Sequence, residues 1–397
     1  MRFSLCSRPS GANSLPQFRA CMITGLVRFA QRDAMRGHTM QTRTALVRGV
    51  GSHNGGAELL LRAAAEAVRT WGDRAAVDRR QVSSALRRDW VLRGYWGIQR
   101  FQRFAGTGLD MLPRRAAHAL DLATWRHIDY VLDASGFSYG DQWSPANIEQ
   151  VAFAAARWQR RGVPFILLPQ SYGPFERPEI RSAVGRLFES ATQIWVRDAV
   201  SMEHVTALLG ADERVRMAPD ITIGLHAPSG SSVAPGTVAV IPNINLATRK
   251  PERGGLPAYA QGLVDVITAL RADGANAVLL LHSTHGDPRV VEECTRLAPD
   301  IEVIAPSNGL EAKAFIAQCD AVVSGRFHGL VSALSTGVPA IAQAVAGHLG
   351  EPAAERRDRR AGSRPGRVGR GCRGRVTTSP SCSSRRKASR TGWAEMP

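Results

Sequence analysis

An arginine and a histidine two residues apart are the residues of this sequence best suited to chemistry. Arg326 and His328 follow the short apolar run 321–323 and precede an apolar segment with helical spacing. Arg326 carries a permanent positive charge, and His328 titrates near neutral pH. Together they suit an anionic substrate that must exchange a proton.

Each member of this pair also has a purely structural interpretation. A histidine at a helix start can cap or pack, and an arginine beside it can be a solvated surface charge. The small residues Ser324, Gly325 and Gly329 favour the functional interpretation, because they leave space around both side chains.

A glycine-rich turn near the start of the regular pattern supplies two further candidates. The strand-like segment 45–50 leads into the turn 51–56 and a helical segment, 57–71. Backbone N–H groups at such a helix start can bind an anion. Asn54 could hold a substrate hydroxyl or cap the helix, and Glu58 could contact substrate or be an exposed first-turn charge.

Gln170 and Arg197 follow two later strand-like segments, 164–168 and 193–196. Because ligands of open α/β sheets bind beyond the carboxyl ends of the strands, both residues are candidates for binding. Arg197 could instead pair with a neighbouring acid such as Asp198.

The loop after another strand-like segment contains His282, His285 and Asp287. These are residue types that bind zinc, but a zinc site needs its ligands held in tetrahedral geometry. One flexible loop rarely provides that geometry. We therefore predict no metal site, and we predict that the protein uses no cofactor.

Strand-like and helical segments alternate from residue 44 to 346, which predicts an α/β fold. A run rich in Pro, Gly and Ser, 227–236, reads as a linker. We expect two doubly wound Rossmann-like domains facing across a cleft, at 43–226 and 237–346. The poorly periodic region 72–127 predicts an insertion of loops and short helices.

The flanks of this pattern carry most of the net charge of +17: residues 1–42 carry +5 and residues 351–397 carry +9. A nucleic-acid-binding fold should instead place a basic stripe on ordered elements, so we expect no specific nucleic-acid partner. We interpret residues 1–42 as a disordered or mis-assigned extension. Residues 347–397 are either a disordered basic tail or a frame-shifted reading of GC-rich coding sequence, and the abrupt change in composition favours the second.

The chain lacks the sequence signals of membrane and secreted proteins. No run approaches the ~18 to 20 apolar residues of a membrane span, and no secretory signal opens the chain. Its six cysteines show no metal-ligand spacing. We expect a cytoplasmic protein with at most peripheral membrane association.

Five segments, in order between about residues 44 and 346, resemble the polysaccharide pyruvyl transferase family. The segment most specific for the family is the one with Arg326 and His328. The five segments are Asn54–Glu58, Gln170–Phe175, Val196–Asp198 with Ser201, Ala218–Asp220, and Ser324–Gly329 continuing to Pro339–Ala342.

The resemblance implies a glycosyltransferase-B-like fold and transfer of a pyruvyl group from phosphoenolpyruvate to a sugar. The sugar would belong to a cell-surface polysaccharide or its lipid-linked precursor, and the product would be a cyclic ketal. The implied residues are His328 and Arg326 for catalysis, Arg197, Arg326 and Ser324 for the donor, and Asn54, Glu58 and Gln170 for the acceptor.

The sequence departs from the family pattern after Pro339–Ala342. Family members usually continue into a segment with a lysine and a closing helix, whereas here no lysine lies between Lys313 and Lys387. Two alternatives therefore stay open. One is a nucleotide-sugar glycosyltransferase of similar architecture, and the other is a truncated, non-catalytic relative.

Overall fold

A computed structural model of the chain describes residues 3–6, 42–51, 54–78, 81–82, 87, 93–96, 112–227, 233–248 and 254–343. The tail 347–397 and most of residues 1–42 lie outside these ranges, so the predictions for them are not tested. The described residues belong to one compact unit.

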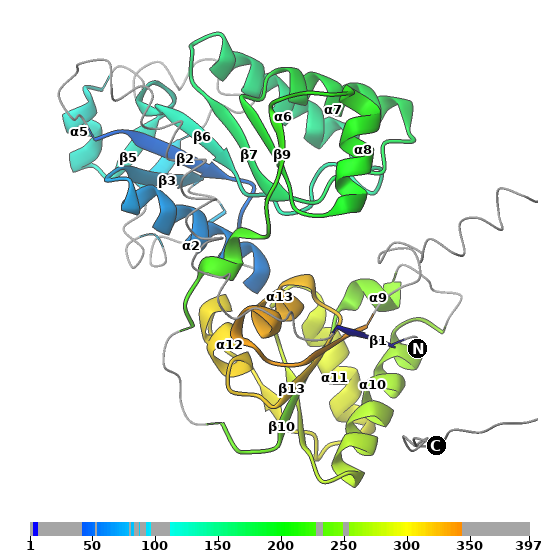
Figure 1. Ribbon diagram of the computed structural model, residues 1–397. Coiled ribbons are helices and arrows are strands. Elements are labelled where there is room, and N and C mark those ends of the chain that lie inside the picture. Colours follow the sequence, from blue (N-terminus) through cyan, green and yellow to red (C-terminus); the bar gives the residue numbers. More distant parts are fainter. Residues whose placement is uncertain are drawn as a thin grey trace, which may run out of the picture. The chain divides into compact units, whose positions relative to one another are not determined.

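Within the described ranges, eight parallel strands form the first sheet, in the order β5-β4-β3-β2-β6-β7-β8-β9 (Figure 1). The inner strands are apolar on both faces because helices cover both faces of the sheet. The strands are β2 (Thr44–Arg48), β3 (Arg74–Asp78), β4 (Arg93–Trp96), β5 (Leu122–Thr124), β6 (Tyr130–Asp133), β7 (Phe165–Gln170), β8 (Gln193–Val196) and β9 (Val215–Met217).

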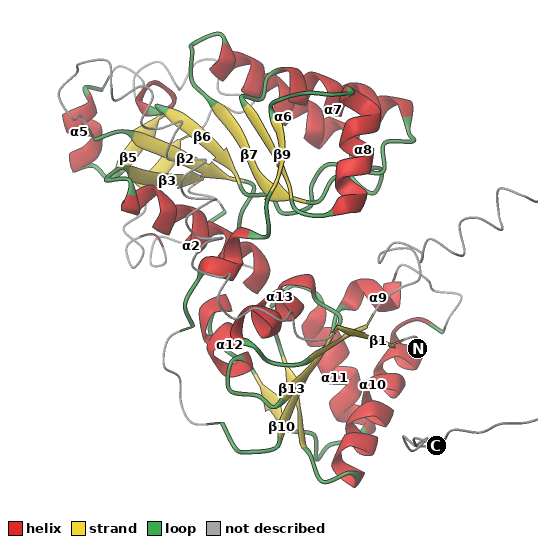
Figure 2. Ribbon diagram, viewed as in Figure 1, coloured by secondary structure: helices red, strands yellow, loops and turns green. Residues whose placement is uncertain are grey.

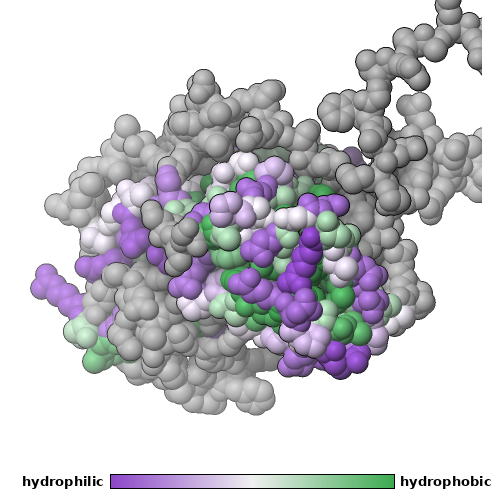
Figure 3. Space-filling view, turned by 90° about the horizontal axis from the view of Figure 1, so that it is seen from below, coloured by the Kyte–Doolittle hydropathy of each residue, from purple (hydrophilic) through white to green (hydrophobic). Residues whose placement is uncertain are grey.

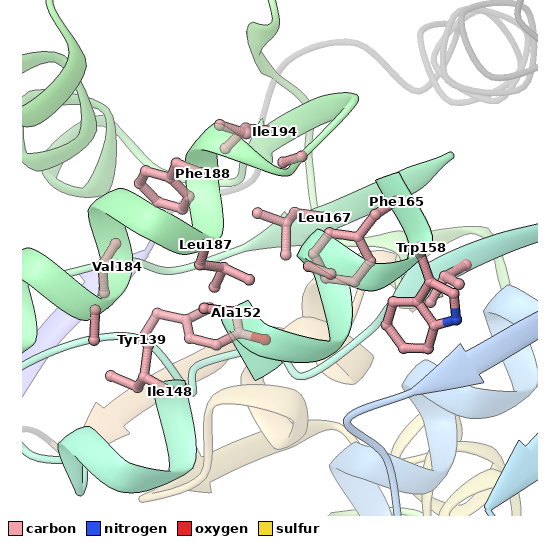
Figure 4. Packing of buried hydrophobic residues seen from close by; sticks show 14 of the residues in the cluster. Tyr139, Ile148, Ala152, Trp158, Phe165, Leu167, Val184, Leu187, Phe188 and Ile194 are labelled. Atoms are coloured by element: carbon pink, nitrogen blue, oxygen red, sulfur yellow. The ribbon is translucent and has the colours of Figure 1, made fainter. Parts of the chain in front are cut away.

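Helix α2 (Gly55–Thr70) packs on one face of this sheet, and α6 (Pro145–Gln159), α7 (Pro178–Glu189) and α8 (Ala199–Leu209) pack on the other. Proline in the first turn of α6 and α7 suits a helix start, where its missing N–H would have no intrahelical partner. Figure 4 shows the core of the second face, where side chains of α6 and α7 surround Phe165 and Leu167 of β7.

The second sheet has the order β1-β14-β13-β10-β11-β12 in the part of the chain that is described. All its neighbouring strands are parallel except β1 and β14, which are antiparallel. The strands are β1 (Phe3–Cys6), β10 (Thr237–Ile241), β11 (Asn276–Leu280), β12 (Val303–Ile304), β13 (Ala321–Ser324) and β14 (Ala340–Gln343).

Helices again cover both faces of the second sheet (Figure 2). Residues of α9 (Ile244–Thr248), α10 (Gly255–Ala272) and α11 (Asp287–Leu297) share one core cluster with the sheet. Those of α12 (Gly309–Ile316) and α13 (Phe327–Thr336) share the other. Figure 3 shows hydrophilic residues lying among and around hydrophobic ones on the face seen from below.

The strand orders place a switch point in each sheet. The chain runs from β2 to β3 on one side and later returns to β6 on the other side of β2. In the second sheet β10 has β11 on one side and β13 on the other. Ligands of doubly wound sheets bind beyond the carboxyl ends of the strands at such points. The predicted α/β class with two Rossmann-like sheets is therefore confirmed.

The region 72–127 differs from its prediction. Instead of an insertion of loops and short helices, its described residues contribute β3, β4 and β5 to the first sheet, together with α5 (Arg114–Ala119) and the 3-10 helix η1 (Trp125–His127). These strands are only three to five residues long, too short to show a clear period in the sequence.

Part of the segment 1–42, interpreted as a disordered or mis-assigned extension, also differs from its prediction. Residues 3–6 form β1 and pair with β14 from Phe3 opposite Gln343 to Cys6 opposite Ala340. A strand at a sheet edge needs partners on one side only, and four residues show no recognisable hydrophobic pattern.

Candidate functional site

Arg326 stands at the end of β13, at the switch point of the second sheet. Its guanidinium donates from Nε to Asp287 Oδ2 at 2.8 Å and from Nη2 to Asp287 Oδ1 at 2.5 Å. The Asp287 side chain is fully buried, and that of Arg326 is 12% exposed. A two-point bond of this kind fixes the plane of the guanidinium group.

Ser324 shapes the turn that carries Arg326. Its hydroxyl donates to the Arg326 carbonyl at 2.9 Å and accepts from the Arg326 N–H at 3.0 Å. The residue is fully buried. In this arrangement Ser324 supports the arginine through its backbone, rather than offering its hydroxyl to a donor substrate.

His328 lies in the first turn of α13, and its ring packs against the start of α2. A Cβ atom on Gly56 would lie only 2.4 Å from His328 Nδ1. On the other side, His328 Nε2 lies 3.6 Å from Asp220 Oδ2, which is beyond normal hydrogen-bond length. The imidazole therefore sits between a glycine and a carboxylate.

Arg197, which follows β8, belongs to the same network. It donates from Nε to Ser171 Oγ at 2.8 Å and from Nη1 to Asp220 Oδ2 at 2.9 Å. Its guanidinium carbon lies 3.9 Å from the centre of the Phe327 ring, a favourable cation–π contact. Phe327 stands between Arg326 and His328, so the chain brings both predicted arginines and the histidine together.

Asp220 is the N-cap of the 3-10 helix η2 (Ile221–Gly224), and its carboxylate lies between Arg197 and His328. Its Oδ1 accepts from the N–H and the hydroxyl of Thr222. Burial alone would raise the pKa of the Asp220 carboxyl, but His328, Arg197 and Thr222 outweigh that effect and hold the pKa well below its usual range. Asp220 therefore remains a carboxylate at neutral pH.

Replacing Gly56 by alanine tests whether the His328 ring must pack directly against this glycine. Alanine in place of glycine normally stabilises a helix by roughly 1 kcal/mol. Here the new Cβ would meet His328 Nδ1 at 2.4 Å, so we expect the ring to be displaced and activity to fall by about 100-fold. Gly185→Ala in α7 is the matched control, because a Cβ there meets no atom within 4 Å. Equal thermal stability and activity for the two variants would contradict the packing described.

The two candidates at the start of α2 have clear structural roles. Asn54 is the N-cap of the helix, and its Oδ1 accepts a hydrogen bond from the Gly56 N–H at 3.0 Å. The residue itself is exposed to solvent. Glu58 is buried, not an exposed first-turn charge. Its Oε2 accepts from the Gly309 N–H at 3.0 Å, at the first residue of α12. Glu58 thus joins α2 to α12 and does not point to an open acceptor site.

Glu58 should make stability depend on pH. Burial raises its pKa above the ordinary value of 4.5, and the Gly309 N–H only partly opposes this. The folded state therefore binds the proton more tightly than the unfolded state, and stability falls as pH rises through and above 4.5. We expect Glu58→Gln to melt at a higher temperature than the parent near neutral pH, and the difference to shrink at lower pH. Thermal unfolding across pH measures this, with the exposed Glu149→Gln as control.

Gln170 does not reach a surface where it could contact an acceptor. It is fully buried, and its Nε2 lies 3.4 Å from Asp133 Oδ1 at the end of β6. Asp133 also accepts from Tyr139 Oη and pairs with Arg48. In this arrangement the side chain belongs to the polar network under the strand ends, and the acceptor contact of Gln170 stays a prediction.

Sequence reasoning did not assign roles to two residues that organise the site. From the sequence, Asp287 is a candidate only as a zinc ligand, and Asp220 only as part of a family segment. A carboxylate placed after a strand, as both are, is a usable signal for a partner of a strand-end arginine. Which arginine each one pairs with depends on the strand order.

The described residues hold no group of three or more His, Cys, Asp or Glu side chains that could bind a metal ion. No helix in these ranges is both long and apolar enough to cross a membrane.

The site contains two oriented guanidinium groups, one imidazole and two buried carboxylates. Such a set can bind a small anion with two charged groups and exchange one proton with it.

Solved structures with a similar chain trace include proteins in complex with UDP-glucose or UDP, but the similarity is distant. Anabaena HepE in complex with UDP-glucose has a TM-score of 0.48 and 13% identity, covering 76% of this chain and 80% of that one. Staphylococcus aureus MnaA with UDP has a TM-score of 0.47 and 12% identity, covering 76% and 78%. At these values the similarity says nothing about activity.

Similarity in sequence is more specific. No curated protein matches the chain significantly. The family model for polysaccharide pyruvyl transferase matches residues 54–345, which include every residue of the site described above.

Proposed function

This chain belongs to the polysaccharide pyruvyl transferase family, and we propose that it transfers the pyruvyl group of phosphoenolpyruvate to two hydroxyls of a sugar. The sugar is part of a polysaccharide or of its lipid-linked precursor. The products are a cyclic ketal and inorganic phosphate.

The two arginines suit such a donor. Phosphoenolpyruvate carries a phosphate and a carboxylate, and guanidinium groups match both kinds of oxygen. Arg326 is held by Asp287 through Nε and Nη2, and Arg197 is held by Ser171 and Asp220 through Nε and Nη1. These bonds orient each group before the donor arrives, which lowers the entropic cost of binding.

His328 is the proposed proton-transfer residue. In the reaction the methylene carbon of the donor gains a proton, and a sugar hydroxyl attacks the adjacent carbon and loses one. A second hydroxyl then displaces phosphate and gives up its proton, so that atoms and charges balance. Imidazole suits both steps, and the Asp220 carboxylate lies 3.6 Å from its Nε2.

One observation carries this proposal. Arg326 and His328 flank Phe327, whose ring lies under the Arg197 guanidinium at 3.9 Å, so residues from the two sheets meet at one point. That point lies at the carboxyl ends of β8 and β13, where ligands of such folds bind.

The direct test incubates the full chain with phosphoenolpyruvate and a panel of glycans. We expect phosphate release that requires an acceptor, together with a matching gain of one pyruvyl unit in the acceptor mass. Phosphate release without a modified glycan, or transfer from a nucleotide sugar instead, would rule out the proposed reaction.

A further inference from the structure

His282 is a buried histidine next to the site that the proposed mechanism does not use. It lies just beyond β11, is 4% exposed, and its carbonyl accepts from the Gly55 N–H at 3.2 Å. A Cβ on Gly55 would lie 3.2 Å from both Cε1 and Nδ1 of its ring. The two adjacent glycines at the start of α2 therefore each face an imidazole, Gly55 that of His282 and Gly56 that of His328.

Among the residues that the structure describes, neither ring nitrogen of His282 has a hydrogen-bond partner, and both are shielded from solvent. His328 Nε2 and Glu58 Oε1, around the same first turn of α2, are also buried and have no hydrogen bond to a described residue. Buried polar atoms in folded proteins are nearly always hydrogen-bonded. Several such atoms in one place are polar groups that a bound molecule can satisfy.

The chemistry of the ring narrows the kind of partner. Burial lowers the pKa of His282 to about 3, and the positive charges of His328 and Arg326 act in the same direction. A neutral imidazole has one donor and one acceptor nitrogen. A sugar hydroxyl likewise has a donor and an acceptor, whereas the anionic groups of the donor substrate are better matched by the arginines.

We propose that His282 binds the acceptor sugar, with its neutral imidazole hydrogen-bonded to a hydroxyl beside His328 and Arg326. This inference rests on the proposed function. Because both ring nitrogens are shielded, the contact between Gly55 and the end of β11 must open for the sugar to enter.

His282→Leu is the main test, because leucine fills a similar volume without polar nitrogens. We expect the KM for the acceptor to rise about tenfold, as for one lost hydrogen bond, and the KM for phosphoenolpyruvate to stay unchanged. The melting temperature should be equal or higher, since an unpaired buried group is removed. His282→Asn, which keeps a donor and an acceptor, should recover part of the acceptor affinity.

His285→Leu, an exposed position in the same loop, is the matched control and should leave both KM values unchanged. An unchanged acceptor KM in His282→Leu, with or without lower stability, would overturn the inference and leave His282 a packing residue. If the parent transfers no pyruvyl group to any glycan, the proposed function fails separately. Binding of neutral methyl glycosides to the parent and to His282→Leu then decides the inference, and equal affinity for both overturns it.

Discussion

Replacing His328 by asparagine should lower kcat by about 100-fold or more, the usual effect of removing a positioned acid or base. Asparagine keeps a polar, uncharged group of smaller size, so it should not clash with Gly56 or disturb Asp220. It cannot carry a proton to or from the substrate near neutral pH. We therefore expect donor binding to survive and the chemical step to fail, which single-turnover measurements with phosphoenolpyruvate would show.

The control for this prediction is His204→Asn in α8, a histidine that packs on Gly173 and Phe175. It should keep the parent kcat. If His328→Asn retains more than about a tenth of the parent kcat, His328 contributes less than a positioned acid or base does, and proton transfer must be assigned to another group.

Arg326→Lys should lower kcat/KM by about 100-fold, although it keeps the charge. The ammonium group of lysine cannot reproduce the two bonds from Nε and Nη2 to Asp287, so its position is no longer fixed. The loss should appear mainly in the KM for phosphoenolpyruvate. Arg296→Lys, in the exposed pair with Glu293, is the control and should have no effect.

Arg326→Ala alone would be difficult to interpret, because it leaves the fully buried Asp287 carboxylate without its partner. Breaking a buried pair in this way costs about 3–5 kcal/mol, which could unfold the chain. The double variant Arg326→Ala with Asp287→Ala avoids this problem. We expect it to be more stable than Arg326→Ala but still inactive. Full activity in the double variant would show that the pair supports only the fold.

Local segments of the sequence predicted the centre of the site well. Arg326 and His328 are separated by one residue within a strand–turn–helix unit, so their proximity depends only on the local chain. Gly337, with φ of 81°, ends the helix, because glycine adopts this conformation without strain. The alternation of apolar strands and helices likewise predicted the two parallel sheets.

Candidates whose surroundings come from distant parts of the chain were predicted less well. Glu58 bonds to Gly309, which is 251 residues away, and Gln170 is buried beside Asp133, which is 37 residues away. In the sequence both look like polar residues at exposed positions. Whether such a residue is exposed depends on which helix or strand packs over it, and the local pattern does not contain that information.

The sequence by itself determined most of the strands and helices and the closely spaced arginine and histidine, since each depends on neighbours a few residues apart. The tertiary structure alone decided that Asp287 orients Arg326, that Asp220 lies between Arg197 and His328, and that Gly55 and Gly56 face two imidazoles. These contacts join segments separated by tens to hundreds of residues. Only the order of the strands in each sheet and the packing of α2 against α12 and α13 bring them together.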